Sequence, residues 1–528
     1  MSRVVTQHEI APGVGASDAM PKGRGQGDRR DEDAPIAVID IGSNSGRMVV
    51  FRLRDGGHLD VLEDARAPLR LARALRDDDR LGPEAIDRTL EALQDFRAVA
   101  LGAGAVLTLA VATSAVREAA DGDELLRRVR DEVGIDLQVI DGDREAVLGF
   151  LGAIHGLPVS DGIVMDVGGG SMELTRFAAR RFGQVWTLPL GSLRLSDRHL
   201  RSDPPTDKEM RKLRQDSEKA LKAAGVVKLG PGEALIGVGG TIRNLAKIDR
   251  RRIDYPLPLL HGYEVPIDRL EELTTFLAER SMARRASTPG LNPDRADTIV
   301  GGALAVLTTM EIVGAERLLV SSRGMREGLA LQEISADLPS PLRVRAASIA
   351  NLATRFATWD ERAGRRRLAI TERLYEALEP EARSDVREML GHAATIVDVG
   401  RAIDYYDRFE HSAMLITSAD LGGFSHHDLG LLTAILRQAD DDVRLGPYRG
   451  LLRKEDREPV LRAATVLALA DSFNRRIPPG GRAEIACRWK RESFEVAAPV
   501  PAGWRPRAVA VRFREVFGRT LVVEPTDR

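Results

Sequence analysis

The chain reads Ile36-Ala37-Val38-Ile39-Asp40-Ile41-Gly42-Ser43-Asn44-Ser45 near its start and Ile163-Val164-Met165-Asp166-Val167-Gly168-Gly169-Gly170-Ser171 further on. In each stretch an apolar run leads to an aspartate, one apolar residue, glycine and then a hydroxyl. An apolar run of this length predicts a buried strand, and the glycines predict a tight turn at its end. Because the pattern occurs twice, we expect a duplicated β-domain with a phosphate cleft between its two halves.

The composition limits the class of protein. At 528 residues the chain is long enough for about three or four domains. Lysine and arginine (77) nearly balance aspartate and glutamate (79), which argues against a nucleic-acid partner held by an overall basic field. Cys487 is the only cysteine, so no internal disulfide can form, as in a reducing cytoplasm. No apolar stretch approaches the roughly 18 residues of a membrane span. We therefore expect a cytoplasmic protein without membrane contact.

The pattern of apolar runs divides the chain into five parts. Residues 1–34 are rich in glycine and charge and predict a disordered leader. Strands alternate with helices in 35–160 and again in 161–335, which is typical of α/β domains. Residues 344–478 are expected to be almost wholly helical. In 480–528 a small C-terminal α+β unit is expected, with short strands at Ala483–Trp489, Phe494–Ala498, Ala508–Phe513 and Thr520–Val523.

Three glycine-rich turns are candidates for phosphate binding. A turn of this kind brings backbone N–H groups close to an anion, where larger side chains would block the approach. One such turn is as readily a plain hairpin, but the third also opens a helix, and a helix N-terminus attracts anions. Three turns in series therefore favour phosphate. The candidate substrate-binding residues are Gly42, Ser43, Asn44, Ser45, Gly168, Gly169, Gly170, Ser171, Gly239, Gly240 and Thr241.

Four carboxylates and one arginine are candidates for the chemistry. Phosphoryl transfer to water needs a cation, donors around the phosphoryl oxygens and a group that activates the water. Asp40 and Asp166 suit a hydrated Mg²⁺, and Glu173 could join them. Glu145 is a candidate base, although its spacing alone is more typical of a solvated helix residue. Arg117 could clamp a phosphate or be an exposed arginine at a helix start.

These residues fall in ordered blocks that resemble the exopolyphosphatase/guanosine pentaphosphate phosphatase (Ppx/GppA) family, within the actin–Hsp70–sugar kinase superfamily. The resemblance runs from about residue 35 to residue 330. Each block alone is modestly specific, but six of them in order at family-like spacing are a strong signal. The six are Asp40–Ser45, Thr113–Arg117, Gly142–Ala146, Asp166–Glu173, Gly239–Thr241 and Arg326–Gly328, and Pro189–Ser192 and Arg295–Asp297 also fit.

The resemblance implies two actin-like (ribonuclease H-like) domains around the phosphate cleft, and Mg²⁺-dependent hydrolysis of terminal phosphates. It gives Glu145 the catalytic role of activating water and makes Glu173 the second required carboxylate. Asp40 and Asp166 match the metal-side aspartates of the family, while Arg117 and the glycine turns match its phosphate contacts. The resemblance also implies a homodimer, and it leaves a role for K⁺ open.

Two positions depart from the family pattern. Arg144 stands where many relatives carry an acid, and Met172 stands where a threonine is usual. Neither departure removes a carboxylate of the expected site, so they bear on fine specificity rather than on activity.

The helical part resembles the HD-type phosphohydrolase fold, whose site holds a metal ion with histidine and aspartate. Val397 precedes Asp398 where that fold would place its histidine. With a central ligand lost, we expect a structural or substrate-channel role rather than an HD-type metal site. The pair His426-His427 is expected in a loop. The remaining plausible ligand positions are His411, Ser412 and Asp471.

Arginine clusters could line a path for a polyanion, although charge runs usually form solvated faces. The candidates are Arg250–Arg252, Arg284–Arg285 and Arg365–Arg367.

The leading hypothesis is an exopolyphosphatase that removes terminal phosphate processively from inorganic polyphosphate. The alternative within the family is a guanosine pentaphosphate 5′-phosphatase, which needs a nucleoside pocket beside the same cleft. An ATP-dependent kinase is less favoured, because the Gly142–Ala146 block favours water as the acceptor. A non-catalytic regulator that binds polyphosphate or an alarmone is also less favoured, because all four candidate carboxylates are intact.

Overall fold

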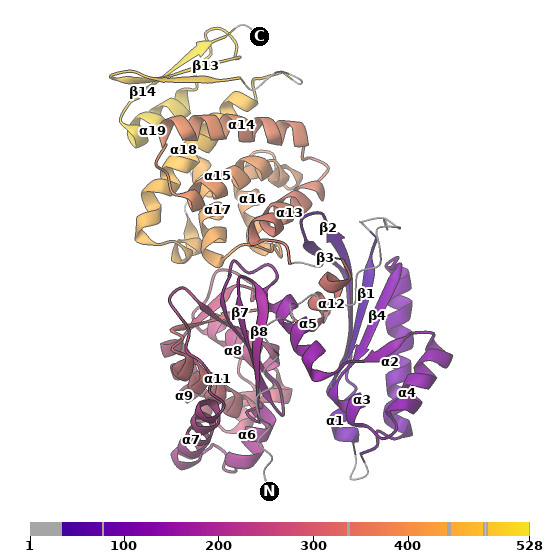
Figure 1. Ribbon diagram of the computed structural model, residues 1–528. Coiled ribbons are helices and arrows are strands. Elements are labelled where there is room, and N and C mark those ends of the chain that lie inside the picture. Colours follow the sequence, from indigo (N-terminus) through magenta and orange to yellow (C-terminus); the bar gives the residue numbers. More distant parts are fainter. Residues whose placement is uncertain are drawn as a thin grey trace. The chain divides into compact units, whose positions relative to one another are not determined.

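The chain divides into two compact units. Unit 1 holds the described residues up to Asp254 together with Leu260–Val344, and unit 2 holds Tyr255–Leu259 and the described residues from Arg345 onward. Figure 1 shows sheets and helices in unit 1 and mainly helices in unit 2. Within the described ranges, every helix is too short or too polar to serve as a membrane span. Residues 1–33 of the expected leader lie outside the part that the computed structural model describes, which is 34–75, 79–334, 338–440, 445–478, 481 and 484–526.

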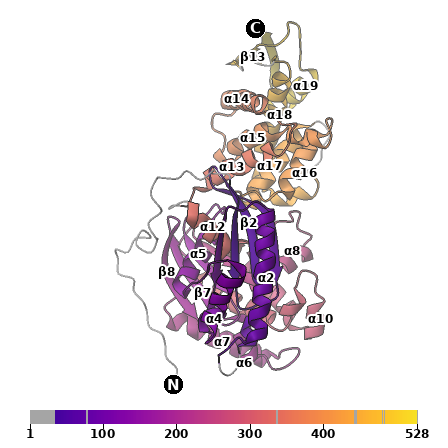
Figure 2. The ribbon, with the colours of Figure 1, turned by 90° about the vertical axis from the view of Figure 1, so that its right-hand side faces the viewer.

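Unit 1 contains a five-stranded sheet centred on β1 (Ile36–Ile41). Its order is β3-β2-β1-β4-β5, and β1 is antiparallel to β2 and parallel to β4. Buried apolar side chains of the sheet pack against α2 (Pro83–Gly102), which Figure 2 shows beside β2. This sheet and the helices on it form the first lobe. Its other elements are β2 (Gly46–Arg54), β3 (His58–Ala67), α1 (Leu71–Ala74), β4 (Leu107–Ala112), α3 (Ser114–Glu118), α4 (Gly122–Arg128), the π-helix η1 (Val129–Val133) and β5 (Leu137–Val139).

Unit 1 also contains a six-stranded sheet of related order. Its strands run β10-β11-β9-β6-β7-β8, and β6 (Gly162–Val167) is antiparallel to β7 and parallel to β9. β6 therefore holds the place that β1 holds in the first sheet. This sheet and its helices form the second lobe, and unit 1 as a whole is mixed α/β. Its other elements are β7 (Met172–Ala178), β8 (Arg181–Leu188), α6 (Ser192–His199), α7 (Asp207–Ala223), β9 (Ala234–Val238), α8 (Gly239–Arg252), β10 (Tyr263–Pro266), α9 (Ile267–Ala278), α10 (Met282–Ala286), the 3-10 helix η2 (Pro293–Arg295), α11 (Ile299–Val313) and β11 (Arg317–Val320).

Two crossing helices, α5 (Gly142–Ile154) and α12 (Met325–Ile334), connect the lobes. Leu148 of α5 is buried in a core that also contains side chains of β1, β2 and α12. Phe150 and Ile154, further along α5, are buried in a core with side chains of β6, β7 and β9. Because one short helix contributes to the cores of both sheets, its position is fixed by both lobes.

Glycines allow α5 and α12 to approach each other closely. A Cβ atom added at Gly152 would lie 1.8 Å from the carbonyl oxygen of Gly324, and one added at Gly328 would lie 1.9 Å from the carbonyl oxygen of Leu148. Both neighbours are backbone atoms, which cannot swing aside as the end of a long side chain can. A larger residue at either glycine would therefore have to separate the helices.

Unit 2 has one extended core of buried apolar side chains drawn from its helices and from the C-terminal strands. The helices are α13 (Pro341–Thr354), which starts in unit 1, α14 (Glu361–Leu378), α15 (Ser384–Ile396), η3 (Val399–Ala402), α16 (Arg408–Ser418), α17 (His426–Ala439), η4 (Gly446–Leu451), η5 (Lys454–Asp456) and α18 (Arg457–Asn474). The expected run of helices is thus present in the described residues of this unit.

The C-terminal part of unit 2 contains a three-stranded sheet, but one expected strand is wrong. Residues Arg507–Phe517 form the helix α19 rather than a strand over Ala508–Phe513. Phe513 packs against Phe517 one helical turn further on, with ring centroids 4.7 Å apart, and against Phe494 of the strand Ser493–Ala498, with centroids 5.7 Å apart. The contact with Phe494 is a tertiary one, and it decides between two periods that a short apolar run leaves open. The strands are β12 (Ala486–Trp489), β13 (Ser493–Ala498) and β14 (Thr520–Pro525).

Two arginines and two aspartates form a buried cluster in unit 2. The guanidinium of Arg367, which is 1% exposed, bonds to both Asp398 and Asp471. Arg408 bonds to the same two carboxylates and lies 2.5 Å from Asp398 Oδ1. Burial alone would raise the pKa of Asp398, but the two arginines outweigh it and lower that pKa. Asp471, one of the three positions expected to remain plausible metal ligands, is thus paired with two arginines.

The other polar candidates of unit 2 have local partners. The Ser412 hydroxyl donates to the carbonyl oxygen of Val397 at 2.9 Å. His426 and His427 are the first two residues of α17, so their expected place in a loop is wrong. Ser425 caps this helix, which the sequence signals by the spacing of Ser425 and Asp428. His427 Nε2 lies 2.8 Å from Asp456 Oδ2.

Replacing Gly328 by alanine is expected to destabilise unit 1. The new methyl group would overlap the backbone of Leu148, and overpacking of this kind costs about 1–3 kcal/mol. Gly149→Ala is the matched control, because Gly149 also lies on α5 but has nothing within 4 Å of an added Cβ. It is expected to gain up to about 1 kcal/mol from helix propensity. Urea unfolding of both variants makes the comparison, and equal midpoints would contradict the close crossing.

Removing Arg367 is expected to destabilise unit 2 strongly. Arg367→Met leaves a buried carboxylate with less positive charge around it, which costs about 3–5 kcal/mol. Arg365→Met is the control, because Arg365 is exposed and pairs with Glu361 on the same helix. That change should stay within about 0.5 kcal/mol. Thermal unfolding followed by circular dichroism measures both, and similar transitions for the two variants would refute the cluster's role.

Candidate active site

The two aspartates lie at equivalent positions in the two sheets. Asp40 on β1 pairs with Arg47 on β2, and Asp166 on β6 pairs with Glu173 on β7. In each hairpin the paired residues are seven positions apart and enclose the glycine turn. The duplication expected from the sequence is therefore also present in the strand register, with an arginine in one lobe where the other lobe has a glutamate.

The first two glycine turns share one geometry. The N–H of Gly42 donates to the carbonyl of Ser45 at 3.2 Å, and the N–H of Gly168 donates to the carbonyl of Ser171 at 3.0 Å. Within the described part of the chain, the N–H groups of Gly169 and Gly170 have no protein acceptor. Such a turn offers its remaining N–H groups to a bound anion.

Helix α6 fixes the second turn from behind. The N–H of Ser192 donates to the carbonyl of Gly168 at 2.9 Å, and the N–H of Leu193 donates to that of Gly169 at 3.0 Å. A Cβ at Gly191 would lie 2.3 Å from the carbonyl carbon of Gly170, so only glycine fits this contact. The carbonyl groups of the turn are thereby held against α6.

The third glycine turn lies inside a helix and does not form a separate loop before that helix. Gly239, Gly240 and Thr241 form the first turn of α8, in agreement with the expectation that this turn opens a helix. Gly239 has φ +89°, and a Cβ there would lie 2.5 Å from Asp166 Oδ1. The backbone at the start of α8 thus runs directly beside Asp166, at the helix end that favours anions.

Glu145 lies in the first turn of α5, close to Arg117. Asp141 caps this helix by accepting a hydrogen bond from the N–H of Arg144 at 2.7 Å. Arg117, on α3, donates to the carbonyl oxygen of Ile140 at 2.6 Å, and its Nη1 atom lies 3.8 Å from Glu145 Oε2. The expected clamp arginine and the expected base are therefore neighbours.

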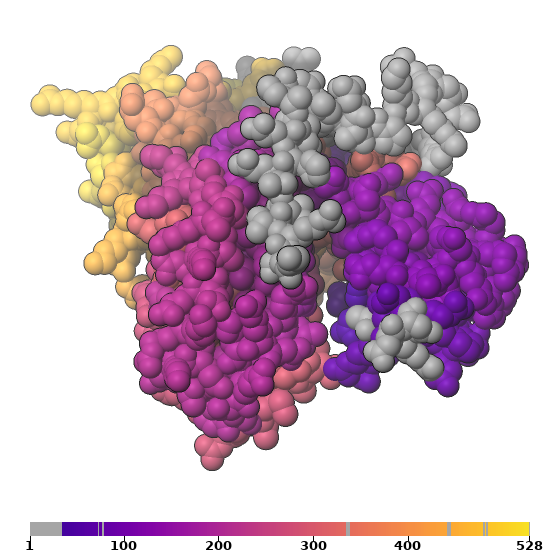
Figure 3. Space-filling model, turned by 60° about the horizontal axis from the view of Figure 1, so that its bottom comes forward, coloured from indigo at the N-terminus to yellow at the C-terminus, as the bar shows by residue number. Residues whose placement is uncertain are grey.

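The four carboxylates face a shared space. Burial raises the pKa of Glu145 to about 7; Arg117 works against this, while the charges of the other three carboxylates add to it. For this to happen, groups from both lobes must lie near Glu145. Unit 1 is hollowed between its two lobes in the space-filling view (Figure 3). Burial also raises the pKa of Asp40 to about 6, that of Glu173 to about 7 and that of Asp166.

Several arginines surround the carboxylates, and the sequence did not single all of them out. Arg243, in α8, is half-buried and donates to the carbonyl of Ser322 at 3.3 Å. Burial lowers the pKa of Arg47 to about 10, and the charges of Arg326, Arg243 and Arg66 lower it further. The signal for Arg47 is its place seven residues after Asp40, but Arg243 is recognised only once α8 is placed beside β6.

The arginines expected to line a polyanion path differ in their burial and in their partners. Arg367 is buried in the cluster of unit 2 and is not available to a substrate, whereas Arg365 is exposed and pairs with Glu361. Arg285 is buried and pairs with Asp203 at 2.9 Å. The guanidinium of Arg252 lies 3.9 Å from the Phe276 ring centroid. Arg250 and Arg251, near the end of α8, continue the basic side of that helix.

Met172 does not alter the site. Its side chain is fully buried, and the hydroxyl of Thr309 lies 3.4 Å from its sulfur atom. Because side chains alternate along a strand, Met172 points into the second lobe while Glu173 points the other way.

A further group of potential metal ligands lies in unit 2. Asp404, Asp407 and His411 offer ligand atoms within 4.8 Å of one another, which the spacing of His411 alone did not predict. Acidic side chains at a surface often gather in this way without an ion.

The family of the chain follows from its match to family models. The model of the Ppx/GppA phosphatase family matches residues 49–336, and the model of Ppx/GppA phosphatase domain III matches residues 344–504. The chain belongs to the Ppx/GppA phosphatase family. Because its named relatives are exopolyphosphatases, it is an enzyme of the phosphoanhydride hydrolase class.

Two relatives named as exopolyphosphatases and one solved structure agree with the assignment to the Ppx/GppA family. Exopolyphosphatase 1 of Mycobacterium bovis is 30% identical over 322 residues, 60% of this chain and 92% of that protein. Exopolyphosphatase 1 of Mycobacterium leprae is 31% identical over 306 residues, 57% of this chain and 90% of that protein. The crystal structure of the Aquifex aeolicus Ppx/GppA family member is 29% identical, with a TM-score of 0.53, over 57% of this chain and 97% of that one.

The rate of phosphate release should fall as the pH falls below about 7. If Glu145 is the base that was expected from the sequence, it must be ionised to accept a proton, and its active form is lost on the acid side of its raised pKa. At limiting substrate, kcat/KM should drop about tenfold per pH unit there. A carboxylate with an ordinary pKa would keep its full rate to about pH 5. A flat profile between pH 5.5 and 8 would contradict the raised pKa.

Proposed function

We propose that this phosphatase removes terminal phosphate from inorganic polyphosphate, with water as the acceptor. Glu145 carries the proposal, because it combines a pKa of about 7 with three carboxylates and an arginine around it. A general base is most effective when its pKa lies near the working pH. The relatives named exopolyphosphatase support polyphosphate as the substrate. Guanosine pentaphosphate, the other substrate of the family name, is the alternative.

In this proposal Glu145 accepts a proton from the attacking water. The water oxygen forms a bond to the terminal phosphorus as the phosphoanhydride bond opposite to it breaks. Arg117 and the N–H groups of the glycine turns bind the phosphoryl oxygens, whose charge is greatest during the transfer. Arg117 also favours the ionised form of Glu145 and so opposes part of the effect of burial, since a neighbouring cation stabilises a carboxylate.

Mg²⁺ is proposed to bind at Asp40 and Asp166, with Glu173 beside them. Burial raises the pKa of all three, so a bound cation would favour their ionised forms. Within the described residues these carboxylates do not converge within 4.8 Å. That agrees with an ion that keeps several waters and takes one or two carboxylates. When bound, Mg²⁺ would offset charge on the phosphate. A role for K⁺ stays open.

The basic side of α8 favours a polymer over a compact nucleotide. Arg243, Lys247 and Arg251 recur every four residues and therefore lie on one face of the helix. Burial lowers the pKa of Lys247, and the charges of Arg243, Arg250 and Arg251 lower it further, so these cations lie close together. A chain of phosphates carries a charge on every unit and can use such a row along its length.

The remaining parts of the proposal concern the context of the enzyme. The strand order around β1 and β6 supports two actin-like domains. The aspartates neutralised by Arg367 and Arg408 support a structural role for an HD-like helical domain. The single cysteine supports a cytoplasmic location, and a homodimer is proposed on family resemblance.

Glu145→Gln is expected to lower phosphate release by about 10²–10⁴-fold, because glutamine cannot accept the proton from water. Binding of the substrate should change little. Asp143→Asn is the matched control, because Asp143 is exposed in the same first turn of α5. Both variants are assayed with Mg²⁺ on long-chain polyphosphate and on guanosine pentaphosphate, side by side with the unchanged protein.

Each outcome of this assay decides a point. Release from polyphosphate that is lost only in Glu145→Gln supports the proposal. A clear preference for guanosine pentaphosphate would favour the alternative substrate. Full activity of Glu145→Gln would overturn the assignment of the base.

A further inference from the structure

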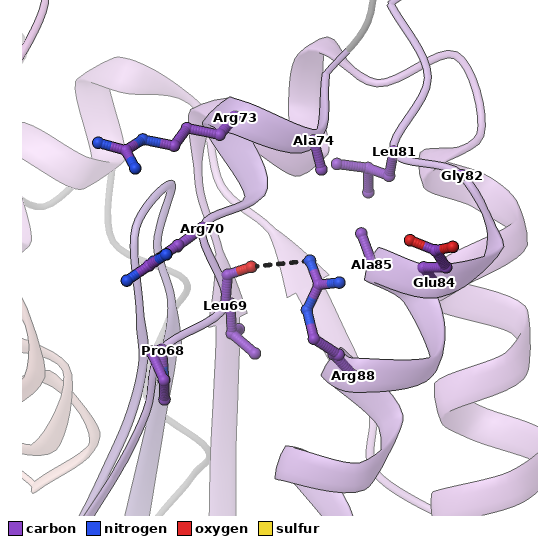
Figure 4. A pocket seen from close by; sticks show the side chains of 10 residues that line it. All are labelled: Pro68, Leu69, Arg70, Arg73, Ala74, Leu81, Gly82, Glu84, Ala85 and Arg88. Carbon is purple, nitrogen blue, oxygen red and sulfur yellow. Dashed lines mark hydrogen bonds between the residues drawn. The ribbon is translucent and has the colours of Figure 1, made fainter.

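A cavity of about 580 Å³ opens in the first lobe, between the end of β3, α1 and the start of α2 (Figure 4). Its floor is apolar and consists mainly of the buried residues Leu69, Leu81 and Ala85. A cavity of this volume lies within the range of ligand sites. The cavity is separate from the residues described above as the active site.

Three arginines line this cavity. Figure 4 shows Arg70 and Arg73 on one side of Leu69 and Arg88 on the other, where Arg88 donates to the Leu69 carbonyl oxygen at 3.2 Å. Glu84 is the acidic residue of the lining. Within the described ranges, none of the three guanidinium groups has a carboxylate within salt-bridge distance. Guanidinium groups with this freedom bind phosphate oxygens, often in pairs of parallel hydrogen bonds.

The same wall of the cavity touches the first glycine turn of the active site. The N–H of Arg70 donates to the carbonyl oxygen of Asn44 at 2.9 Å. The side chain of Leu69 packs at the end of that turn, because a Cβ added at Gly46 would lie 3.0 Å from its Cδ1 atom. A change at Arg70 is therefore transmitted to the turn by a hydrogen bond and a packing contact.

Arg70 is also held in an unusual backbone conformation. Its φ and ψ angles are 52° and 40°, in the left-handed region that favours glycine. A residue that keeps a side chain at such a position stores strain, and strained residues cluster at ligand and switch sites. The side chain at this position is the one that projects beside the cavity.

We propose that this cavity is a second anion site, which binds a compact ligand with several phosphate charges and acts on the Gly42–Gly46 turn through Arg70. Short inorganic polyphosphates and the phosphates of a nucleotide share this chemistry. The site regulates the first glycine turn and does not itself perform hydrolysis. Binding here is independent of whether the proposed function is correct.

The first test counts binding sites by isothermal titration with inorganic tripolyphosphate. A Glu145→Gln background is used so that the ligand survives. We expect two sites per chain in that background, and one site after Arg70→Gly and Arg73→Gln are added. Arg70→Gly removes the guanidinium while glycine tolerates the φ angle. The exposed Arg73 side chain makes no hydrogen bond or ion pair within the described residues, so folding should be preserved. Circular dichroism checks this.

The control adds Arg181→Gln to the same background. Arg181 is an exposed arginine on β8, so its loss changes the charge but not the cavity. The control should keep two sites. Loss of the pocket arginines should weaken the second site at least tenfold, as expected for lost charge-assisted hydrogen bonds. One site in every protein, or two sites that persist without Arg70 and Arg73, would overturn the proposal.

A second titration separates the two sources of the ligand. Adenosine triphosphate replaces tripolyphosphate, so that the phosphate chain is the same length but carries a nucleoside. Tighter binding of the nucleotide at the second site assigns it to nucleotides, and tighter binding of tripolyphosphate assigns it to short polyphosphates. If neither ligand binds at the second site, the anion site is refuted.

The coupling to the active site is tested by kinetics with an otherwise active protein. Methylenebisphosphonate, which resists hydrolysis, is added to assays of phosphate release from long-chain polyphosphate. The proposal predicts a shift in KM that is at least twofold larger in the unchanged protein and in Arg181→Gln than in Arg70→Gly/Arg73→Gln. Equal shifts in all three proteins would show that the ligand acts only at the active site, which would refute the coupling.

Discussion

The close crossing of α5 and α12 is the constraint on which the site depends. Backbone meets backbone where Gly152 faces Gly324 and where Gly328 faces Leu148, so the two helices have little freedom to slide or part. α5 carries Glu145 at its start and contributes side chains to the cores of both sheets. The distance from Glu145 to the carboxylates of the two lobes is therefore set by packing at the centre of unit 1, away from the chemistry itself.

The duplicated hairpins provide the rest of the site, and their difference is informative. Both lobes place an aspartate one residue before the end of a buried strand that turns on glycine. The partner of Asp40 is Arg47, whereas the partner of Asp166 is Glu173. One hairpin thus presents a carboxylate and a guanidinium group, and the other presents two carboxylates. The two halves therefore differ in charge: the first places a cation beside its aspartate, and the second places another carboxylate there.

The sequence predicted those features that depend on local pattern. The strand ends at Asp40 and Asp166 and the glycine turns follow from apolar runs and backbone freedom, and the structure brings their residues together. Glu145 needed the family resemblance, because its burial and its raised pKa arise from groups far away in the chain. Arg243 was missed for the same reason. The strand expected over Ala508–Phe513 was wrong because a short apolar run fits two periods until Phe513 finds its tertiary partners.

The central claim is that the two lobes present a terminal phosphoryl group to a water held by Glu145. A single turnover in ¹⁸O-labelled water tests it directly, since the label marks the phosphorus that the water attacked. The account predicts one ¹⁸O atom in the released orthophosphate and none in the shortened chain. Label in the new chain end would mean attack at the penultimate phosphorus, and unlabelled products would mean that another acceptor takes the phosphoryl group. Either result would contradict the account.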